Sequence, residues 1–249
     1  MTDVSGTYDV VASLGANCSA AHNINLRGLR KAALPFDWTY VVDEAPYRWL
    51  AAHLPDRFAD LCNRENLERI LPGHPEWAEA HKGFLKYIDR GSGFRFVNHF
   101  RKPIEEAGEF ERVHGMLRRR IDRFCELLGS ARRVLLVLAT GVAVSDETLT
   151  ELRQAFMRQF PGADFTISFL RFGAEDEGER SVDEGVFCQT VRRSMNRYDL
   201  ERTNFEWAFL DGVSLTSGKV GGSFHLSFDV WPKIRLVADF RLKRKTGDA

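Results

Sequence analysis

Cys18 has the surroundings that a nucleophilic cysteine needs. The apolar run Tyr8–Leu14 ends at Gly15, and Asn17, Cys18 and Ser19 then lead into a helical pattern. The first N–H groups of a helix have no partner within the helix and carry partial positive charge, which favours thiolate over thiol. The same N–H groups, in a turn built from Gly15, Asn17 and Ser19, would stabilise an oxyanion. We therefore expect Cys18 to attack an acyl carbon.

A nucleophilic thiol needs a base, and His99 is the first candidate. It closes the segment 91–100, GSGFRFVNHF, which is typical of a strand that ends in a polar pair. Functional groups gather at strand ends in open α/β sheets, so we expect His99 to accept the thiol proton. The alternative is a histidine that merely closes a strand. His225, with Asp211 as the nearest approximation to an Asp-x-x-His pair, is the second candidate for the base.

Asp37 stands between two large aromatic residues, Phe36 and Trp38. We expect the carboxylate to be hydrogen-bonded, because burial of an unpaired charge is costly. Two roles are open: a structural role such as capping the following helix, and orientation of the imidazole of His99. The structural role is favoured.

The segment 13–38, SLGANCSAAHNINLRGLRKAALPFDW, resembles the N-terminal signature of a bacterial family of papain-like cysteine peptidases, a domain of unknown function. The signature is a Ser-Leu-Gly turn, a cysteine shortly after it, a helix that ends in a Leu-Arg pair, and then Pro-Phe-Asp-Trp. The matching residues here are Ser13, Leu14, Gly15, Cys18, Leu29, Arg30, Pro35, Phe36, Asp37 and Trp38. The family also has a histidine-containing aromatic motif, which we place on His99. The resemblance therefore implies a nucleophilic cysteine and a Cys-His dyad.

The composition is that of a globular protein without a strong charge bias. The chain has 249 residues, 44% of them hydrophobic and 28% charged, with a formal net charge of zero. A neutral chain gives no reason to expect nucleic acid or an acidic membrane as a partner. Its 19 phenylalanines predict an aromatic-rich core or an apolar substrate groove.

The cysteines give no sign of a metal site. The four of them, Cys18, Cys62, Cys125 and Cys188, are far apart and form no Cys-x-x-Cys pair. We predict neither a metal nor a cofactor, and we expect the other three cysteines to be core residues. The polar start MTDVSGTYD does not resemble a signal peptide, and no apolar run reaches transmembrane length. These features predict reduced thiols and a cytoplasmic location.

Strands and helices alternate along the middle of the chain. Continuous apolar runs at 133–140 and 165–170 predict buried strands, and periodic patterns at 105–129 and 145–160 predict amphipathic helices. Together with Tyr8–Leu14, they predict a single α/β domain over 1–249. We expect a three-layer, Rossmann-like, mostly parallel sheet with helices on both faces. The papain-like α+β fold is the alternative.

Further segments of the chain carry predictions of their own. Residues 185–191 form a further strand-like run, and 224–240 predict an antiparallel edge hairpin, so that 184–249 is a possible antiparallel extension. We expect a short helix at 66–70 and an exposed acidic loop at 173–184. The run Arg118–Arg120 is either a solvated basic face or, as the sharper alternative, a phosphate or carboxylate site.

Three functions are consistent with these features. The first is hydrolysis of an acyl substrate, which could be a small molecule, a glycan or a peptide, by a Cys18–His99 dyad that Asp37 orients. The second is acyl transfer by the same dyad, for example onto a glycan in polysaccharide assembly. The third is a non-enzymatic binding module in which Cys18 is structural. An unreactive thiol would favour the third.

Overall fold

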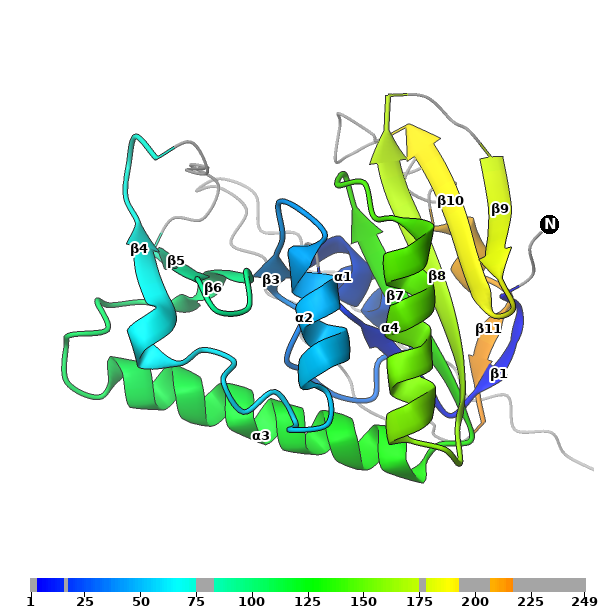
Figure 1. Cartoon of the computed structure of the whole chain (residues 1–249), viewed down its shortest axis with the longest axis horizontal. Helices are drawn as coiled ribbons and strands as arrows, with labels where there is room; N and C mark the ends of the chain where they lie inside the picture. Colours follow the sequence, from blue (N-terminus) through cyan, green and yellow to red (C-terminus); the bar gives the residue numbers. More distant parts are fainter. Residues whose placement is uncertain (1–3, 16–17, 75–82, 175–177, 193–206, 217–249) are drawn as a thin grey trace, which may run out of the picture. The chain divides into compact units, whose positions relative to one another are not determined.

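The computed structural model describes residues 4–15, 18–74, 83–174, 178–192 and 207–216. All of these belong to one compact unit, Met1–Ser217, while the second unit, Gly218–Ala249, lies outside the described residues. The predicted hairpin at 224–240 and its His225 therefore also lie outside them. The described part is a mixed α/β structure whose helices pack on sheets that include parallel strands (Figure 1).

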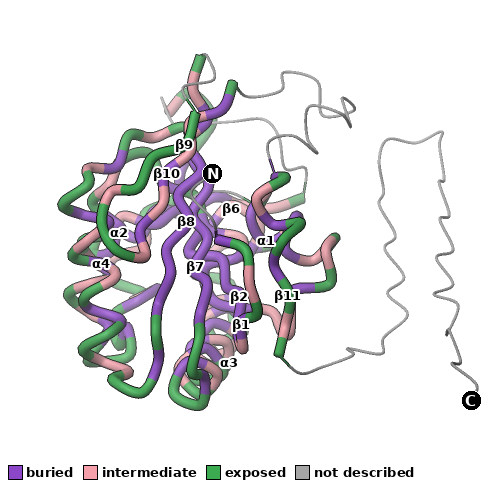
Figure 2. The backbone as a smooth tube through the Cα atoms, turned by 90° about the vertical axis from the view of Figure 1, so that its right-hand side faces the viewer, coloured by how far each residue is buried: buried purple, intermediate pink, exposed green. Residues whose placement is uncertain are grey.

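The main sheet has five strands in the order β2-β7-β8-β10-β9. These are β2 (Val10–Ser13), β7 (Arg133–Thr140), β8 (Asp164–Gly173), β10 (Val186–Arg192) and β9 (Gly178–Asp183). The first four are parallel, and β9 pairs antiparallel at the edge. β7 lies between two parallel neighbours and is buried on both faces, which explains its unbroken apolar sequence (Figure 2).

Helices cover both faces of this sheet. They are α1 (Cys18–Leu26), α2 (Ala45–His53), α3 (Glu109–Ser130) and α4 (Asp146–Gln159). Alternate residues of β7 divide between two cores: Leu136 packs with the apolar sides of α3 and α4, and Leu135 packs with Ala20 and Ile24 of α1. Because successive side chains of a strand point to opposite faces, α1 and α4 lie on opposite sides of the sheet.

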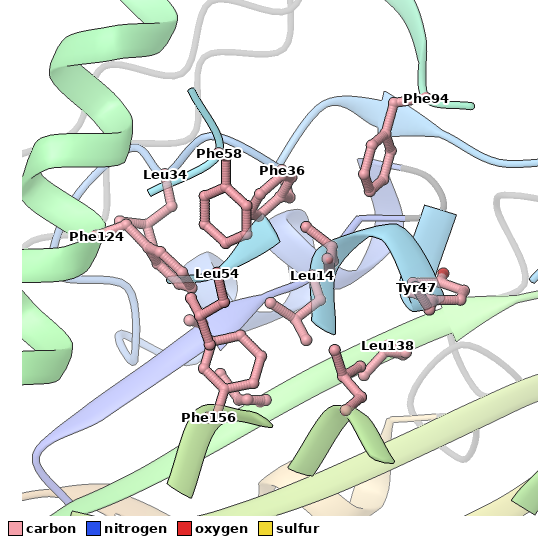
Figure 3. Packing of buried hydrophobic residues seen from close by; sticks show 14 of the residues in the cluster. Leu14, Leu34, Phe36, Tyr47, Leu54, Phe58, Phe94, Phe124, Leu138 and Phe156 are labelled. Carbon is pink, nitrogen blue, oxygen red and sulfur yellow. The ribbon is translucent and has the colours of Figure 1, made fainter. Parts of the chain in front are cut away.

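A second, antiparallel sheet has the order β3-β6-β5-β4. Its strands are β3 (Thr39–Tyr40), β6 (Arg95–Phe100), β5 (Leu85–Asp89) and β4 (Leu67–Ile70), with the short 3-10 helix η1 (Arg64–Asn66) before β4. Aromatic rings join this sheet to the rest of the unit: Phe36 stacks on Phe94 at 5.4 Å and meets Phe58 and Phe124 edge-on at 5.3 and 5.9 Å between ring centroids. Figure 3 shows these rings in one cluster with Leu14 of the β2 turn. The many phenylalanines thus contribute to the predicted aromatic core.

A third, two-stranded parallel sheet pairs β1 (Gly6–Tyr8) with β11 (Val213–Leu215). The 3-10 helix η2 (Ala208–Leu210) precedes β11, and Leu210 is buried. None of the helices in the described ranges is both long and apolar enough to cross a membrane.

Two predictions of local structure are wrong. Residues 67–70 form β4 and not a helix, and 178–183, within the predicted acidic loop, form β9. In each case the strand is selected by its pairing partner, a contact that local sequence does not report. β10 pairs parallel with β8 and antiparallel with β9, and most of 193–249 lies outside the described residues, so an antiparallel extension over 184–249 stays a prediction.

Candidate functional site

Cys18 is the first residue of α1, and its side chain is exposed. The predicted order of strand, turn and helix is therefore confirmed. Ala20, Ala21 and Ile24 are the apolar residues that anchor the helix in the core, and they leave Cys18 on its open side. At this position the thiol faces the positive end of the helix dipole, an environment that stabilises a thiolate.

The turn that carries Cys18 lies at the edge of the main sheet, beside two neighbouring strands whose following helices pack on opposite faces. β2 and β7 are hydrogen-bonded neighbours, and the helices that follow them, α1 and α4, pack on opposite faces. In open parallel sheets the crevice at the carboxyl ends of two such strands is where ligands bind. The Cys18 turn follows the carboxyl end of β2 and so belongs to this edge.

Gly15 explains how the turn meets the Pro-Phe-Asp-Trp segment. Its φ is +88°, in the left-handed region, and its N–H donates to Ser13 Oγ at 3.2 Å. A Cβ at this position would collide with Thr39 Oγ1 and lie 3.1 Å from the Phe36 carbonyl oxygen. Only glycine permits both the backbone conformation and this close approach. Gly15 thus positions the turn, and an oxyanion role for it stays a prediction.

Asp37 has a partner other than the predicted histidine. Its side chain is almost fully buried, and its carboxylate accepts hydrogen bonds from Arg30 Nη2 at 2.5 Å and from the Leu34 N–H at 2.8 Å. Burial raises the pKa of Asp37, while Arg30, the Leu34 N–H and Arg120 oppose that shift. These contacts give Asp37 the structural role favoured from sequence. They tie the loop after α1 together and do not orient His99.

His99 is buried in β6, with 4% of its surface exposed. It thus lies in the antiparallel sheet, so the expectation that it ends a strand of the open parallel sheet is wrong. Neither ring nitrogen has a hydrogen-bond partner among the described residues, so neither Asp37 nor Cys18 is bonded to it. Burial, with Arg120 and Arg112 nearby, lowers the pKa of His99 to about 3. The imidazole is therefore neutral at pH 7 and a weak base.

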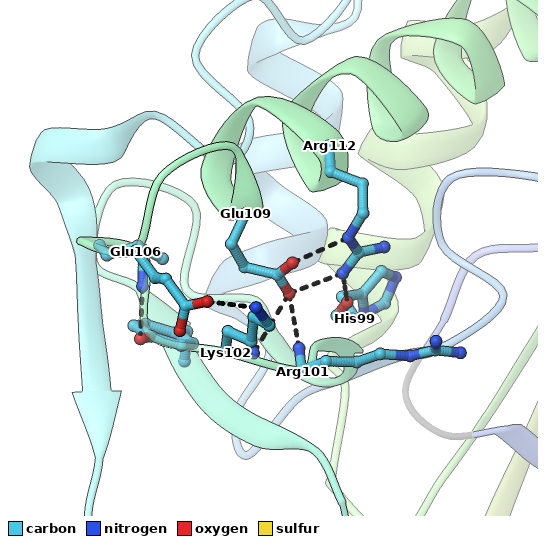
Figure 4. A network of polar contacts seen from close by, with 8 residues as sticks. His99, Arg101, Lys102, Glu106, Glu109 and Arg112 are labelled. Carbon is cyan, nitrogen blue, oxygen red and sulfur yellow. Dashed lines mark hydrogen bonds and ion pairs between the residues drawn. The ribbon is translucent and has the colours of Figure 1, made fainter.

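The backbone around His99 is held by a network of ionic contacts (Figure 4). Arg112 donates to the His99 carbonyl oxygen at 2.8 Å and to both carboxylate oxygens of Glu109. Glu109 also accepts the backbone N–H groups of Arg101 and Lys102, and its pKa is lowered to about 2, chiefly through the hydrogen bonds of Arg112. The network fixes the end of β6 against the first turn of α3.

Strand pairing brings the predicted segments close together. Thr39 of β3 pairs with Phe96 of β6 in antiparallel register, so the end of the Pro-Phe-Asp-Trp segment meets the strand that contains His99. Gly15 contacts the same segment through Phe36 and Thr39. The cysteine turn, the Pro-Phe-Asp-Trp segment and the histidine strand therefore form one region.

The remaining predicted site residues have different outcomes. Ser19 follows Cys18 in the first turn of α1, and its carbonyl oxygen accepts from Asn23 Nδ2 at 3.0 Å. Asp211 is exposed and forms an ion pair with Arg27 at 2.9 Å. Asn17 and His225 lie outside the described residues, so their predicted roles stay predictions.

His22 is a candidate that sequence reasoning missed. It lies on α1 four residues after Cys18, and side chains at this spacing share one face of a helix. Helical side chains lean toward the N-terminus, and this tendency favours an imidazole directed toward the end of α1 that carries Cys18. His22 is half-buried, and burial lowers its pKa. The Cys-x-x-x-His spacing was the signal that could have identified it.

A cavity of about 290 Å³ lies at the carboxyl ends of β8 and β10. Arg171, Arg180, Glu179, Cys188 and Thr190 are among the residues that line it. Burial raises the pKa of Cys188 to about 11, so this thiol stays protonated. The charges around the cavity are mixed, with Arg180 paired to Asp146, and they favour no single class of ligand. Within the described ranges no group of three or more histidine, cysteine or acidic residues could hold a metal ion.

Comparison with known proteins gives little functional information. The chain is similar to "Uncharacterized protein R408" of Acanthamoeba polyphaga mimivirus, with 26% identity over 133 residues. The match covers 50% of this chain and 59% of the viral protein, so the chain spans less than two thirds of that relative. No family model and no solved structure matches the chain.

Proposed function

We propose that this chain is a cysteine hydrolase that transfers an acyl group to water, with Cys18 as the nucleophile. The observation that carries the proposal is the exposed thiol of Cys18 at the N-terminus of α1. It stands at the sheet edge where helices leave two neighbouring strands on opposite faces. The resemblance of segment 13–38 to papain-like cysteine peptidases supports the same nucleophile.

The parallel sheet with helices on both faces supports a three-layer Rossmann-like arrangement for the catalytic unit. In this arrangement a strand leads directly into the cysteine turn, and rigid elements hold the thiol on both sides. A papain-like chemistry on a Rossmann-like sheet is the combination that we propose.

We assign the role of base to His22. It lies on the same helix face as Cys18, one turn away, and the lean of helical side chains toward the N-terminus favours an imidazole directed toward the thiol. His99, the base predicted from sequence, is less suited: its nitrogens are buried and not bonded to the thiol, and two arginines disfavour its protonation. His99 is the alternative base, and histidine variants distinguish it from His22.

The proposed reaction has two stages. His22 takes the proton of the Cys18 thiol, the sulfur attacks the acyl carbon, and the carbonyl electrons become an oxyanion held by first-turn N–H groups of α1. The intermediate collapses to a thioester as the leaving group departs with the proton from His22. Water then attacks the thioester, His22 accepts a proton from it, and the acid product leaves as the thiol recovers its proton.

An acyltransferase would use an alcohol in place of water in the second stage. The same enzyme form, an acyl group on Cys18, precedes both outcomes. A glycan acceptor added to the acylated enzyme therefore distinguishes them, because only a transferase gives an acylated glycan.

The nucleophile can be tested by the pH dependence of iodoacetamide labelling, measured by mass spectrometry of the Cys18 peptide. Cys18 is exposed whereas Cys62 and Cys188 are buried, so faster labelling alone would not be diagnostic. The diagnostic result is a labelling midpoint below about 8.5, the usual pKa of a free cysteine. A midpoint at or above that value would exclude an activated thiol and favour a binding module.

Matched histidine variants identify the base. His22→Gln should slow labelling at pH 7, and His114→Gln should not, because His114 lies on α3 and stacks on Phe110. If His99→Gln slows labelling and His22→Gln does not, the base is His99. Activity is measured on panels of ester, thioester and peptide substrates, and Cys18→Ala should abolish turnover. The wild-type protein should give an acylated Cys18 peptide in mass spectrometry, and the corresponding peptide of Cys18→Ala should carry no acyl group.

A further inference from the structure

Buried polar atoms without partners gather at one place in the structure. Among the described residues, six buried side-chain nitrogen or oxygen atoms have no hydrogen-bond partner. Four of them belong to three residues: Arg30 Nε, Arg120 Nη1, and Nδ1 and Nε2 of His99. Native proteins satisfy nearly all such atoms, so a cluster of four indicates a ligand or water that completes them.

Contacts of α3 place these three residues together. Arg123 donates to the Ala33 carbonyl oxygen at 3.2 Å, and Phe124 meets Phe36 at 5.9 Å, so this face of α3 packs on the loop that follows α1. Arg120 lies three and four residues before them and shares their helix face. The loop thus meets Arg120 from one side.

His99 approaches the same face of α3 from the antiparallel sheet. Its carbonyl oxygen is held by Arg112, two turns before Arg120, and its ring packs edge-on against Phe96 at 5.2 Å. Arg120 is close enough to act electrostatically on both His99 and Asp37. Arg120 is therefore near both the histidine and the Arg30–Asp37 pair.

The cluster has an excess of positive charge. In the part of the chain that the structure describes, Arg30 and Arg120 are opposed by the one carboxylate of Asp37, whose partners are Arg30 and the Leu34 N–H. Arg112 is matched by Glu109. A partly buried guanidinium without an anion of its own is costly, and a bound oxyanion would reduce that cost. The Arg30 side chain is 20% exposed, which provides a solvent-facing side to the cluster.

We propose that Arg30, Arg120 and His99 form a binding site for one oxyanion, a carboxylate or a phosphate. The guanidinium nitrogens donate to its oxygens, and neutral His99 donates through one ring nitrogen. The Arg118–Arg120 run thus includes one arginine that faces a site, while Arg119 is exposed. The proposal rests on the buried cluster and does not depend on the chemistry of Cys18.

The test titrates the full-length chain with acetate and, separately, with inorganic phosphate at constant ionic strength set by chloride. Isothermal calorimetry gives the affinity, and ¹⁵N NMR of histidine side chains follows the imidazole of His99. One of the two anions should bind saturably and move the His99 resonances, and the better ligand identifies the group as carboxylate or phosphate. No saturable change at His99 with either anion would overturn the proposal and leave water as the partner.

Variants on one helix provide the control. Arg120→Met should weaken binding about tenfold or more, because it removes charge-assisted hydrogen bonds, while Arg119→Met should leave the affinity unchanged. Equal affinities in the two variants would overturn the assignment. If Arg120→Met does not fold, Arg120→Lys, which keeps the charge and loses the planar fork, gives the same comparison. Binding should persist in Cys18→Ala, so failure of the proposed enzyme chemistry would not affect this result.

Discussion

The carboxylate of Asp37 and the guanidinium of Arg30 form a hydrogen-bonded ion pair at 2.5 Å in which the Asp37 side chain is only 3% exposed. Asp37→Asn would keep the shape of the side chain and remove the carboxylate that, among the described residues, balances Arg30 and Arg120. Breaking one partner of a buried pair typically costs about 3–5 kcal/mol. We expect a loss of that order, reduced because Arg30 is partly exposed, in urea unfolding monitored by circular dichroism. Glu111→Gln, which breaks an exposed pair with Arg64, should change stability by less than about 1 kcal/mol. Equal effects would contradict a buried, structural Asp37.

Gly15→Ala tests the contact between the cysteine turn and the Thr39 segment. The substitution adds left-handed strain and a clash with the Thr39 hydroxyl, so we expect it to destabilise the fold by about 2–4 kcal/mol. Gly28→Ala is the matched control, because Gly28 also has a positive φ, +68°, but its Cβ would meet nothing within 4 Å. Its cost should be only about 1 kcal/mol. Thr39→Ala in the Gly15→Ala background should recover part of the difference, and no recovery would place the clash elsewhere.

The low pKa of His99 predicts acid sensitivity. An imidazole with a folded pKa of about 3 and an ordinary value of 6.5 takes up a proton in the unfolded chain first, so stability falls as the pH drops through this window. The contribution of His99 to the pH dependence of the free energy of unfolding approaches about 1.4 kcal/mol per pH unit, the value for the uptake of one proton. The difference in slope between wild type and His99→Gln isolates it, because His22 and His114 titrate in both proteins.

The measurement is best made between pH 5 and 6.5 in a buffer without carboxylate or phosphate. Glu109, with its pKa lowered to about 2, adds its own acid-dependent loss only below its ordinary value of 4.5. Identical slopes in wild type and His99→Gln would mean that His99 is already protonated or solvated in the folded protein. Arg112 and Arg120 of α3 are the charged groups that disfavour its protonation.

Two buried tyrosines predict opposite results of the same substitution. The Tyr47 hydroxyl is fully buried and has no partner within the described ranges, and burial raises its pKa. Tyr47→Phe should therefore be neutral or stabilise the fold by about 1 kcal/mol. The Tyr87 hydroxyl accepts the Ile104 N–H at 3.2 Å, so Tyr87→Phe should cost about 1 kcal/mol. Thermal unfolding of the two variants tests both expectations. Destabilisation by Tyr47→Phe would indicate that a bound water contacts the Tyr47 hydroxyl in the wild-type protein.

The elements that could be predicted from sequence are those whose pattern reflects burial alone. The predicted strand 133–140 coincides with β7 because burial on both faces demands an unbroken apolar run, and α3 and α4 follow their apolar periodicity. α4 begins next to Ser145, where the predicted helix 145–160 starts, and Ser145 caps it by accepting a hydrogen bond from the Thr148 N–H. Cys18 at the start of a helix is confirmed for the same reason, since strand and helix signals meet there.

The surroundings of the candidate site could not be predicted in the same way. β9 is polar and exposed, and only its pairing with β10 makes it a strand. The ion pair of Asp37 with Arg30 could not be predicted from sequence, because Arg30 becomes a neighbour of Asp37 only when the loop after α1 folds back. His99 looked accessible as the end of a polar pair, and its burial depends on α3, which follows it in the chain.

The pairing of β1 with β11 has a consequence for biosynthesis. Thr7 and Ser214 contact each other through their hydroxyl oxygens at 3.1 Å although they are 207 positions apart. As the chain leaves the ribosome, β1 has no pairing partner until residues 213–215 emerge, and at about 5–20 residues per second this takes at least ten seconds or so. β2 likewise waits for residues 134–137 of β7. Nascent chains truncated before residue 134 should therefore expose both N-terminal strands to chaperones or to one another, and chains truncated between residues 138 and 213 should expose β1 alone.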